Sequence, residues 1–196
     1  LGAAAAAALS LAFFLAALRS TGAAAAAVWM AHKVVPLNIG GYGRIIGYSI
    51  EGAYRFYRSL VGYDTLTVDG REYEVLPLAR PDINIVDYAF HERGNGSLED
   101  MNRLNQAIYE QCSYKSGPVL ANDFITSKTA LTREEYGDTP LAFAQKFGIR
   151  ADEWERLGSL TVLRSCVVTP YLVSGSNYED YWQNFRNAMT RAIGRV

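Results

Sequence analysis

Thr65-Leu-Thr-Val-Asp-Gly-Arg-Glu-Tyr-Glu-Val75 gives the clearest indication of how this 196-residue chain folds. Apolar and polar residues alternate on both sides of Asp69-Gly70, as they do in strands whose successive side chains point to opposite faces of a sheet. An Asp-Gly pair between two such runs favours a tight turn in which both residues have positive φ. The stretch therefore predicts a β-hairpin with two antiparallel strands.

Further strands and helices are predicted downstream of this hairpin. Residues 83–90 alternate again, and residues 160–169 form a β-rich run. Ser97, with an acidic residue three positions later, is typical of the cap of a helix that ends near Gln111. Residues 177–193 have the apolar period of a closing amphipathic helix. This arrangement predicts an α+β domain with a partly antiparallel sheet.

Two helices are predicted upstream of the hairpin. Residues 22–35 are rich in alanine and have an apolar helical period, which Pro36 ends. Residues 38–43 form a glycine-rich turn, and residues 44–60 repeat apolar and aromatic residues at helical spacing. The glycines of this turn do not follow a strand and lack the spacing of a nucleotide-binding loop, so we interpret them as a break between helices.

The composition is that of a folded domain with one core, because 49% of the residues are hydrophobic and 20% are charged. The net charge of -1 argues against a nucleic-acid-binding protein. Cys112 and Cys166 are too few and too far apart for a disulfide framework, which favours the reducing cytoplasm. Neither Cys-x-x-Cys nor His-x-x-x-His occurs, so no metal site is expected.

Residues 1–18 are a nearly continuous run of Ala, Leu and Phe. The run is only just long enough to span a bilayer, and no basic segment precedes it as in a secretory signal. Three interpretations stay open: a buried alanine-rich helix or fragment end, a membrane or signal segment, and a linker. We do not expect the chain to bind a membrane.

Several motifs resemble those of a known enzyme family. They are Val28-Trp-Met-Ala-His-Lys-Val-Val-Pro-Leu-Asn38, Pro81-Asp-Ile-Asn-Ile-Val-Asp-Tyr88, Met101-Asn-Arg-Leu-Asn-Gln-Ala-Ile-Tyr-Glu-Gln111, Tyr136-Gly-Asp-Thr-Pro-Leu-Ala-Phe143 and Leu163-Arg-Ser-Cys-Val-Val-Thr-Pro-Tyr171. In this order and spacing they resemble the pyridoxal-phosphate (PLP) dependent group II amino-acid decarboxylases, most closely the bacterial tyrosine decarboxylases. The resemblance covers residues 19–196 and leaves out residues 1–18.

The resemblance implies an α/β subunit of the type I PLP-dependent transferase fold. Residues 19–60 would join the large domain to the small one, and residues 61–196 would form the C-terminal small domain. The complete subunit would be a homodimeric cytoplasmic enzyme that converts an aromatic L-amino acid to its amine and CO2. Tyrosine is the favoured substrate, DOPA or another aromatic amino acid the next, and glutamate the third.

His32-Lys33 looks like the Schiff-base lysine of this family but does not have its setting. The family implies a lysine well upstream, in an Asp-Pro-His-Lys context at the end of a strand. Lys33 instead follows an apolar helical pattern, where a surface lysine near a helix C-terminus complements the helix dipole. We therefore expect no catalytic residue in this chain and no activity from it alone. The alternatives are a non-catalytic dimerisation or binding module and a truncated decarboxylase.

Arg164 is the best candidate for binding substrate. Arginine offers a planar, permanently charged fork for a carboxylate, and burying its charge unpaired in an apolar strand would be costly. The residue should therefore have a carboxylate partner or face a cleft. The resemblance implies that Arg164 faces the cofactor site and helps to hold the substrate carboxylate. The alternative is an ion pair with an acidic residue of its own subunit.

Three further residues complete the predicted site. Strand alternation places Cys166 on the same face as Arg164. The matching residue in tyrosine decarboxylases is usually a serine beside the substrate, which implies that Cys166 contacts substrate; a small core cysteine is the alternative. Ser20 and Thr21 precede a helix N-terminus, a natural phosphate site, and the resemblance implies contact with the PLP phosphate of the opposite subunit. Ordinary helix capping is the alternative.

The remaining titratable residues form no triad or metal cluster in the sequence. His91 precedes Gly94-Asn-Gly96 and is expected in a solvated turn, whereas His32 is expected to pack in its helix. Asp82 and Asp87 receive no functional role from their sequence context.

Overall fold

The computed structural model describes residues 22–63, 65–118 and 122–196. The chain divides into two compact units, Leu1–Ile46 and Gly47–Val196. The assignment of residues 19–60 as connecting helices and of 61–196 as a small domain stays a prediction.

The first unit confirms the predicted helix and the turn that follows it. Residues 22–34 are helical, and Lys33 is exposed with its Nζ 5.4 Å from the centre of the Trp29 ring. After the helix, Asn38 Oδ1 accepts hydrogen bonds from the backbone N–H groups of the next two glycines (3.0 and 3.1 Å). A Cβ at Gly41 would lie 2.1 Å from the carbonyl oxygen of Pro36, so only glycine fits there. The glycines therefore serve the turn.

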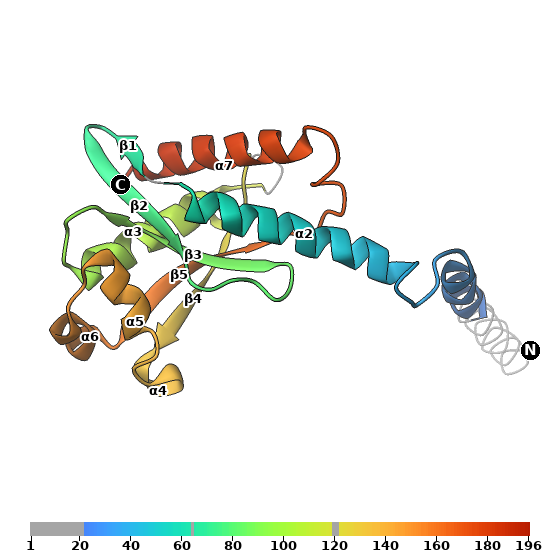
Figure 1. Ribbon diagram of the computed structural model, residues 1–196, viewed down its shortest axis with the longest axis horizontal. Helices are drawn as coiled ribbons and strands as arrows, with labels where there is room; N and C mark the ends of the chain where they lie inside the picture. Colours follow the sequence, from blue (N-terminus) through green and yellow to red (C-terminus); the bar gives the residue numbers. More distant parts are fainter. Residues whose placement is uncertain (1–21, 64, 119–121) are drawn as a thin grey trace, which may run out of the picture. The chain divides into compact units, whose positions relative to one another are not determined.

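The second unit is built on one five-stranded sheet (Figure 1). Its strands are β1 (Leu66–Val68), β2 (Arg71–Pro77), β3 (Ile85–Glu92), β4 (Ser127–Thr132) and β5 (Ser159–Cys166). Their order is β1-β2-β3-β5-β4, and all four pairings are antiparallel, where a partly antiparallel sheet was predicted. The predicted hairpin joins β1 to β2, with φ of 50° at Asp69 and 79° at Gly70.

Helices surround this sheet. The long ones are α2 (Tyr42–Val61), α3 (Leu98–Gln111) and α7 (Asn177–Ile193), and the short ones are α4 (Arg133–Tyr136), α5 (Leu141–Ala144), α6 (Ala151–Leu157), η1 (Tyr114–Ser116) and η3 (Gln145–Phe147). The cap of α3 is confirmed, because Ser97 Oγ accepts a hydrogen bond from the backbone N–H of Asp100 (3.2 Å). Helix α7 has the predicted bounds, and α2 begins two residues earlier than predicted.

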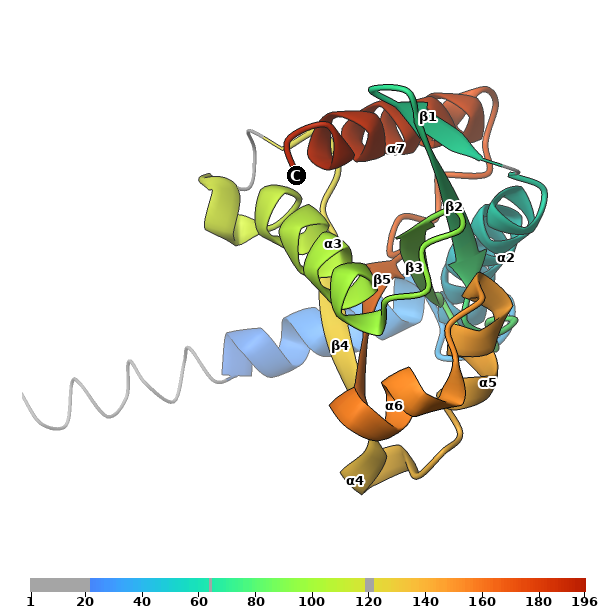
Figure 2. The same ribbon diagram turned by 90° about the vertical axis from the view of Figure 1, so that its left-hand side faces the viewer.

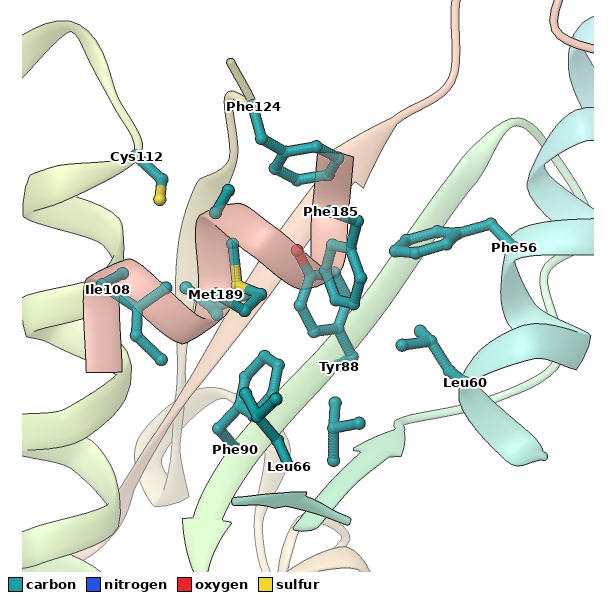
Figure 3. Packing of buried hydrophobic residues seen from close by; sticks show 14 of the residues in the cluster. Phe56, Leu60, Leu66, Tyr88, Phe90, Ile108, Cys112, Phe124, Phe185 and Met189 are labelled. Carbon is teal, nitrogen blue, oxygen red and sulfur yellow. The ribbon is translucent and has the colours of Figure 1, made fainter. Parts of the chain in front are cut away.

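The larger core lies between one face of the sheet and helices α2 and α7. Phe185 of α7 is fully buried, with its ring centre 5.0 Å from that of Phe56 on α2 and 5.7 Å from that of Tyr88 on β3 (Figure 3). Burying one such aromatic side chain contributes roughly 1.5–3 kcal/mol. Alternation along β3 adds Val86 and Phe90 to the same core.

A second, smaller core covers part of the opposite face. Its members come from α3, β3, β4, β5 and the short helices, and they include Ala89 of β3 and Trp154 of α6, which is fully buried. The indole Nε1–H of Trp154 donates to Asp138 Oδ1 (2.9 Å), so the polar edge of the ring has a partner. Side chains of β3 at odd positions thus face a different environment from those at even positions.

The sheet is interrupted between β3 and β5. These strands pair only from Ile85–Cys166 to Tyr88–Leu163, and continued pairing would bring Phe90 opposite Thr161. Instead, α3 lies beside both strands (Figure 2) and supplies amide side chains to their backbones.

Asn105 and Asn102 of α3 replace the missing backbone partners. The N–H of Phe90 donates to Asn105 Oδ1 (2.9 Å), and Asn105 Nδ2 donates to the carbonyl of Phe90 (2.8 Å). The N–H of Thr161 donates to Asn102 Oδ1 (2.7 Å), and Asn102 Nδ2 donates to the carbonyl of Ser159 (2.8 Å). Both strands are therefore anchored to one helix face.

The prediction that His91 lies in a solvated turn is wrong. His91 is on β3 and only 1% exposed, with its ring edge-on to Phe147 of η3 at 6.0 Å. Its Nε2–H donates to the carbonyl of Asn95. Burial lowers the pKa of His91, although nearby Glu74, Asp100 and Glu92 oppose this effect.

We expect Asn105→Leu to destabilise the second unit by about 3 kcal/mol, because two buried backbone groups of Phe90 lose their partners. Chemical denaturation would measure this change in the free energy of unfolding. Asn184→Leu, at an exposed position of α7, is the matched control and should change it little. A loss at Asn105 no larger than that of the control would contradict this account of the interrupted sheet.

We also expect His91 to make the unfolding free energy depend on pH. An unfolded histidine binds a proton near pH 6.5, whereas folded His91 binds it only at lower pH. The unfolded state is therefore protonated first, and stability falls below about pH 6.5 by at most ~1.4 kcal/mol per pH unit. His91→Gln should flatten the stability profile between pH 7.5 and pH 5; an equally steep profile in this variant would assign the dependence to other groups.

Candidate functional site

An ion pair lies on the sheet face that carries the smaller core, beyond the end of that core. Asp87 of β3 and Arg164 of β5 are direct partners in the antiparallel register, and Arg164 also lies opposite Ser127 of β4. Arg164 Nε donates to Asp87 Oδ1 at 3.0 Å. The side chains are 37% and 25% exposed, so the pair is neither buried nor fully solvated.

The pair forms one wall of a cleft of about 460 Å³. The other wall is the loop that joins β2 to β3, and the lining residues from this region are Leu78, Ala79, Arg80, Pro81, Asp82, Ile83 and Ile85. The backbone N–H of Leu78 donates to the carbonyl of Asp87 (2.8 Å), which ties the loop to the strand. Both alternatives for Arg164 are therefore present at once: it has a carboxylate partner of its own chain, and it lines a cleft.

The cleft combines apolar surface with balanced charge. Two arginines and two aspartates line it, and the second arginine, Arg80, lies over the ring of Tyr54 with its Cζ 5.0 Å from the ring centre. Such stacking keeps a guanidinium group in place without neutralising it. Asp82 and Asp87 supply the two negative charges.

The contact through Nε leaves most of the Arg164 guanidinium group available. Among the described residues, Asp87 Oδ1 is its only hydrogen-bond acceptor. A guanidinium has five N–H donors, and its two terminal nitrogens form an edge that can bind a second carboxylate through parallel hydrogen bonds. The group can therefore hold Asp87 and a ligand carboxylate together.

Cys166 does not line this cleft. It pairs with Ile85 across the sheet, is exposed, and lines a neighbouring hollow of about 270 Å³ with residues such as Phe124 and Val168. The alternative that Cys166 is a buried core cysteine is wrong. Cys112 has that role instead: it is buried, and burial raises the pKa of its thiol to about 11.

The predicted contacts to PLP lie outside these residues. Ser20 and Thr21 precede the described part of the chain, so their contact with the cofactor phosphate stays a prediction. The lysines of the sequence are Lys33, Lys115, Lys128 and Lys146, and none of them lines the cleft. The cleft therefore offers arginine side chains that could hold a carboxylate, and no lysine is among its lining residues.

The described residues also bear on metal binding and on membrane insertion. Within residues 22–63, 65–118 and 122–196, no three or more His, Cys, Asp or Glu side chains are grouped so that they could hold a metal ion. No described helix is long and apolar enough to span a membrane.

Asp87 and the loop of residues 78–83 are the parts of the site that sequence reasoning missed. Asp87 alternates with apolar residues of β3, which marks it as facing away from the larger core. Its pairing with Arg164 depends on the register between strands far apart in sequence. The available signal was the presence of one acidic and one basic residue, each among apolar residues, in two predicted strands.

Comparisons with known proteins identify the family of the chain. Residues 52–193 match the family model described as tyrosine decarboxylase, C-terminal. L-tyrosine decarboxylases of Enterococcus faecalis, Levilactobacillus brevis and Enterococcus faecium are 43%, 42% and 40% identical to the chain over 175 residues. The matched region is 89% of this chain but 28% of each relative, so the chain spans less than a third of their length. The chain therefore belongs to the tyrosine decarboxylase family and carries its C-terminal region.

Proposed function

We propose that the chain is the C-terminal part of a decarboxylase subunit that converts L-tyrosine to its amine and CO2. The named activity of its relatives supports the reaction class. The observation that carries the proposal is the cleft in which Arg164 keeps a free guanidinium edge beside apolar residues. An amino-acid decarboxylase needs such a group to hold the substrate carboxylate in a fixed orientation.

Arg164 binds the substrate carboxylate in this proposal and does not transfer protons. Its guanidinium stays charged at any physiological pH, so it can orient the carboxylate but cannot act as a general acid. The apolar residues Leu78, Ile83 and Ile85 line the same cleft and would contact a carbon skeleton. Cys166, in the neighbouring hollow, is proposed to contact another part of the substrate.

The charge balance of the cleft favours tyrosine over glutamate. Asp87 pairs with Arg164, and the cleft is also lined by one further aspartate, Asp82, and one further arginine, Arg80. The two positive and two negative charges balance, so the cleft has no surplus of positive charge for a second carboxylate. A dicarboxylic substrate would bring one more negative charge into a partly desolvated site, at a cost in free energy. DOPA carries the same charge as tyrosine and stays the second choice.

The remaining parts of the active site are proposed to come from the rest of a type I PLP-dependent subunit. PLP, when bound there, supplies an electron sink for loss of CO2. Because no lysine lines the cleft, this chain alone should be inactive. We further propose that the complete enzyme is a cytoplasmic homodimer.

The alternative function, a non-catalytic dimerisation or binding module, has one observation in its favour. The helix of residues 22–34 carries exposed apolar side chains, among them Val28, Trp29 and Val34. Contact with the rest of a decarboxylase subunit would cover them equally well. The coding sequence upstream of Leu1 distinguishes the two functions, because only the enzyme requires an upstream Asp-Pro-His-Lys motif.

In the complete subunit, Arg164→Lys should raise the KM for tyrosine about ten-fold, the cost of losing one bidentate charge-assisted contact. The absorbance of bound PLP should not change, because Arg164 does not hold the cofactor in this proposal. Arg150→Lys is the matched control, since Arg150 also donates through Nε to an aspartate (3.0 Å) but is far more exposed. An unchanged KM in Arg164→Lys would refute the role of this residue.

Cys166 should be alkylated by iodoacetamide in the complete subunit, and an aromatic carboxylate ligand should slow the reaction. The ligand 3-(4-hydroxyphenyl)propanoate carries the ring and carboxylate of tyrosine without its amine. Cys112 is the internal control, because its raised pKa of about 11 and its burial should keep it unreactive. Mass spectrometry of the two cysteine peptides gives both rates, and a rate at Cys166 that does not depend on ligand would place it away from the substrate.

A further inference from the structure

We propose that Asp87 is a positioning residue: it holds Arg164 through Nε so that the terminal edge of the guanidinium group faces the cleft. The proposal rests on the proposed function, in which Arg164 binds the substrate carboxylate. It adds a role for an aspartate that does not itself contact the substrate.

The sheet fixes the relative position of the two residues. Asp87 and Arg164 are paired on adjacent antiparallel strands, so the hydrogen bonds of the ladder set the distance between their backbones. At this backbone distance, Nε of Arg164 and Oδ1 of Asp87 lie 3.0 Å apart. In contrast, the Arg150–Asp152 pair lies on a helix N-terminus with side chains 79% and 63% exposed, where solvent competes for both groups.

Because Asp87 contacts Nε of Arg164, the two terminal nitrogens of the guanidinium group remain available to a ligand. A contact through Nε occupies the side of the guanidinium group nearest the strand and leaves its terminal edge free. A free arginine side chain has many rotamers, and a ligand that had to select one of them would bind more weakly. Asp87 removes this freedom before the substrate arrives.

Asp87 also connects the two walls of the cleft, but through its backbone. Its carbonyl accepts the hydrogen bond from the Leu78 N–H at the start of the loop of residues 78–83. A substitution of the side chain leaves this bond in place. The loop should therefore keep its position in an Asp87→Asn variant, which isolates the contact with Arg164.

The test compares a ligand that has a carboxylate with one that lacks it, in the complete subunit. Calorimetry would measure the Kd of 3-(4-hydroxyphenyl)propanoate, and the inhibition constant of tyramine would report binding without a carboxylate. We expect Asp87→Asn to weaken the propanoate about ten-fold and to leave tyramine within about two-fold, as for loss of one oriented charge-assisted contact. Asp87→Glu, which keeps the charge, should recover part of the loss.

A double-mutant cycle shows whether Asp87 acts through Arg164. In an Arg164→Gln background, Asp87→Asn should cause no further loss of propanoate binding, because the group that it positions is gone. Asp152→Asn, which removes the partner of Arg150, is the matched control and should leave both ligands unaffected. Equal midpoints of thermal unfolding for the variants would show that the fold is intact.

The outcomes separate this inference from the proposed function. If Arg164→Gln leaves propanoate binding unchanged, the proposed role of Arg164 fails and that of Asp87 fails with it. If Arg164→Gln weakens binding but Asp87→Asn does not, or weakens tyramine equally, only the positioning role is overturned. A loss confined to the propanoate, with no further loss in the double variant, supports it.

Discussion

The interruption between β3 and β5 is the constraint on which the rest of the second unit depends. The two strands share four residue pairs and then require other partners for their backbones. Asn102 and Asn105 of α3 provide them, and Asn105 is fully buried while doing so. An unpaired backbone group in this position would cost free energy comparable to a lost hydrogen bond. The positions of α3, β3 and β5 relative to one another are therefore fixed by these side-chain hydrogen bonds.

This anchoring explains why the two faces of the sheet differ. Helix α3 contributes to both cores, with Leu104 and Ile108 in the larger one and Leu98 and Met101 in the smaller. The larger core is also covered by α2 and α7, and the smaller by short helices. The residues of β3 and β5 in the smaller core, Ala89, Leu160 and Val162, all lie outside the paired segment of these strands. The paired segment is where Asp87 and Arg164 lie, and there the sheet face stays open to a cleft.

Local patterns predicted those elements whose cause is local. The Asp69-Gly70 turn, the Ser97 cap and the bounds of α7 depend on a few neighbouring residues, and all were found as predicted. The prediction for His91 was wrong because the turn residues Gly94-Asn-Gly96 follow it closely in sequence. Its ring is buried against Phe147, which is distant in sequence. β4 went unpredicted because only Leu131 among its six residues is buried, so its sequence has little of the alternation that marks a half-buried strand.

Only part of the candidate site could be predicted, because its other contacts join residues that are distant in sequence. Alternation within one strand predicted that Arg164 and Cys166 share a face, but the two residues line different hollows. The partner of Arg164, the loop opposite it and the exposure of Cys166 depend on register and on which helices cover the face. The resemblance of the Leu163–Tyr171 motif to decarboxylases implied a role for Arg164. Only the pairing of β3 with β5 shows that Asp87 binds one side of its guanidinium group.

The contact between Asp87 and Arg164 determines which ligands the cleft can bind. An arginine with no partner would attract any anion, and one whose donors were all occupied would attract none. Arg164 lies between these limits, since one carboxylate takes its Nε and half-burial strengthens what the remaining edge can bind. The exposed side chain of Ile83 lines the same cleft, so the surface that would carry the charge is also one that gains free energy when it is covered. A site completed by the rest of a larger subunit needs both properties: apolar borders that favour its closure, and a charge that is already held in place when closure excludes water.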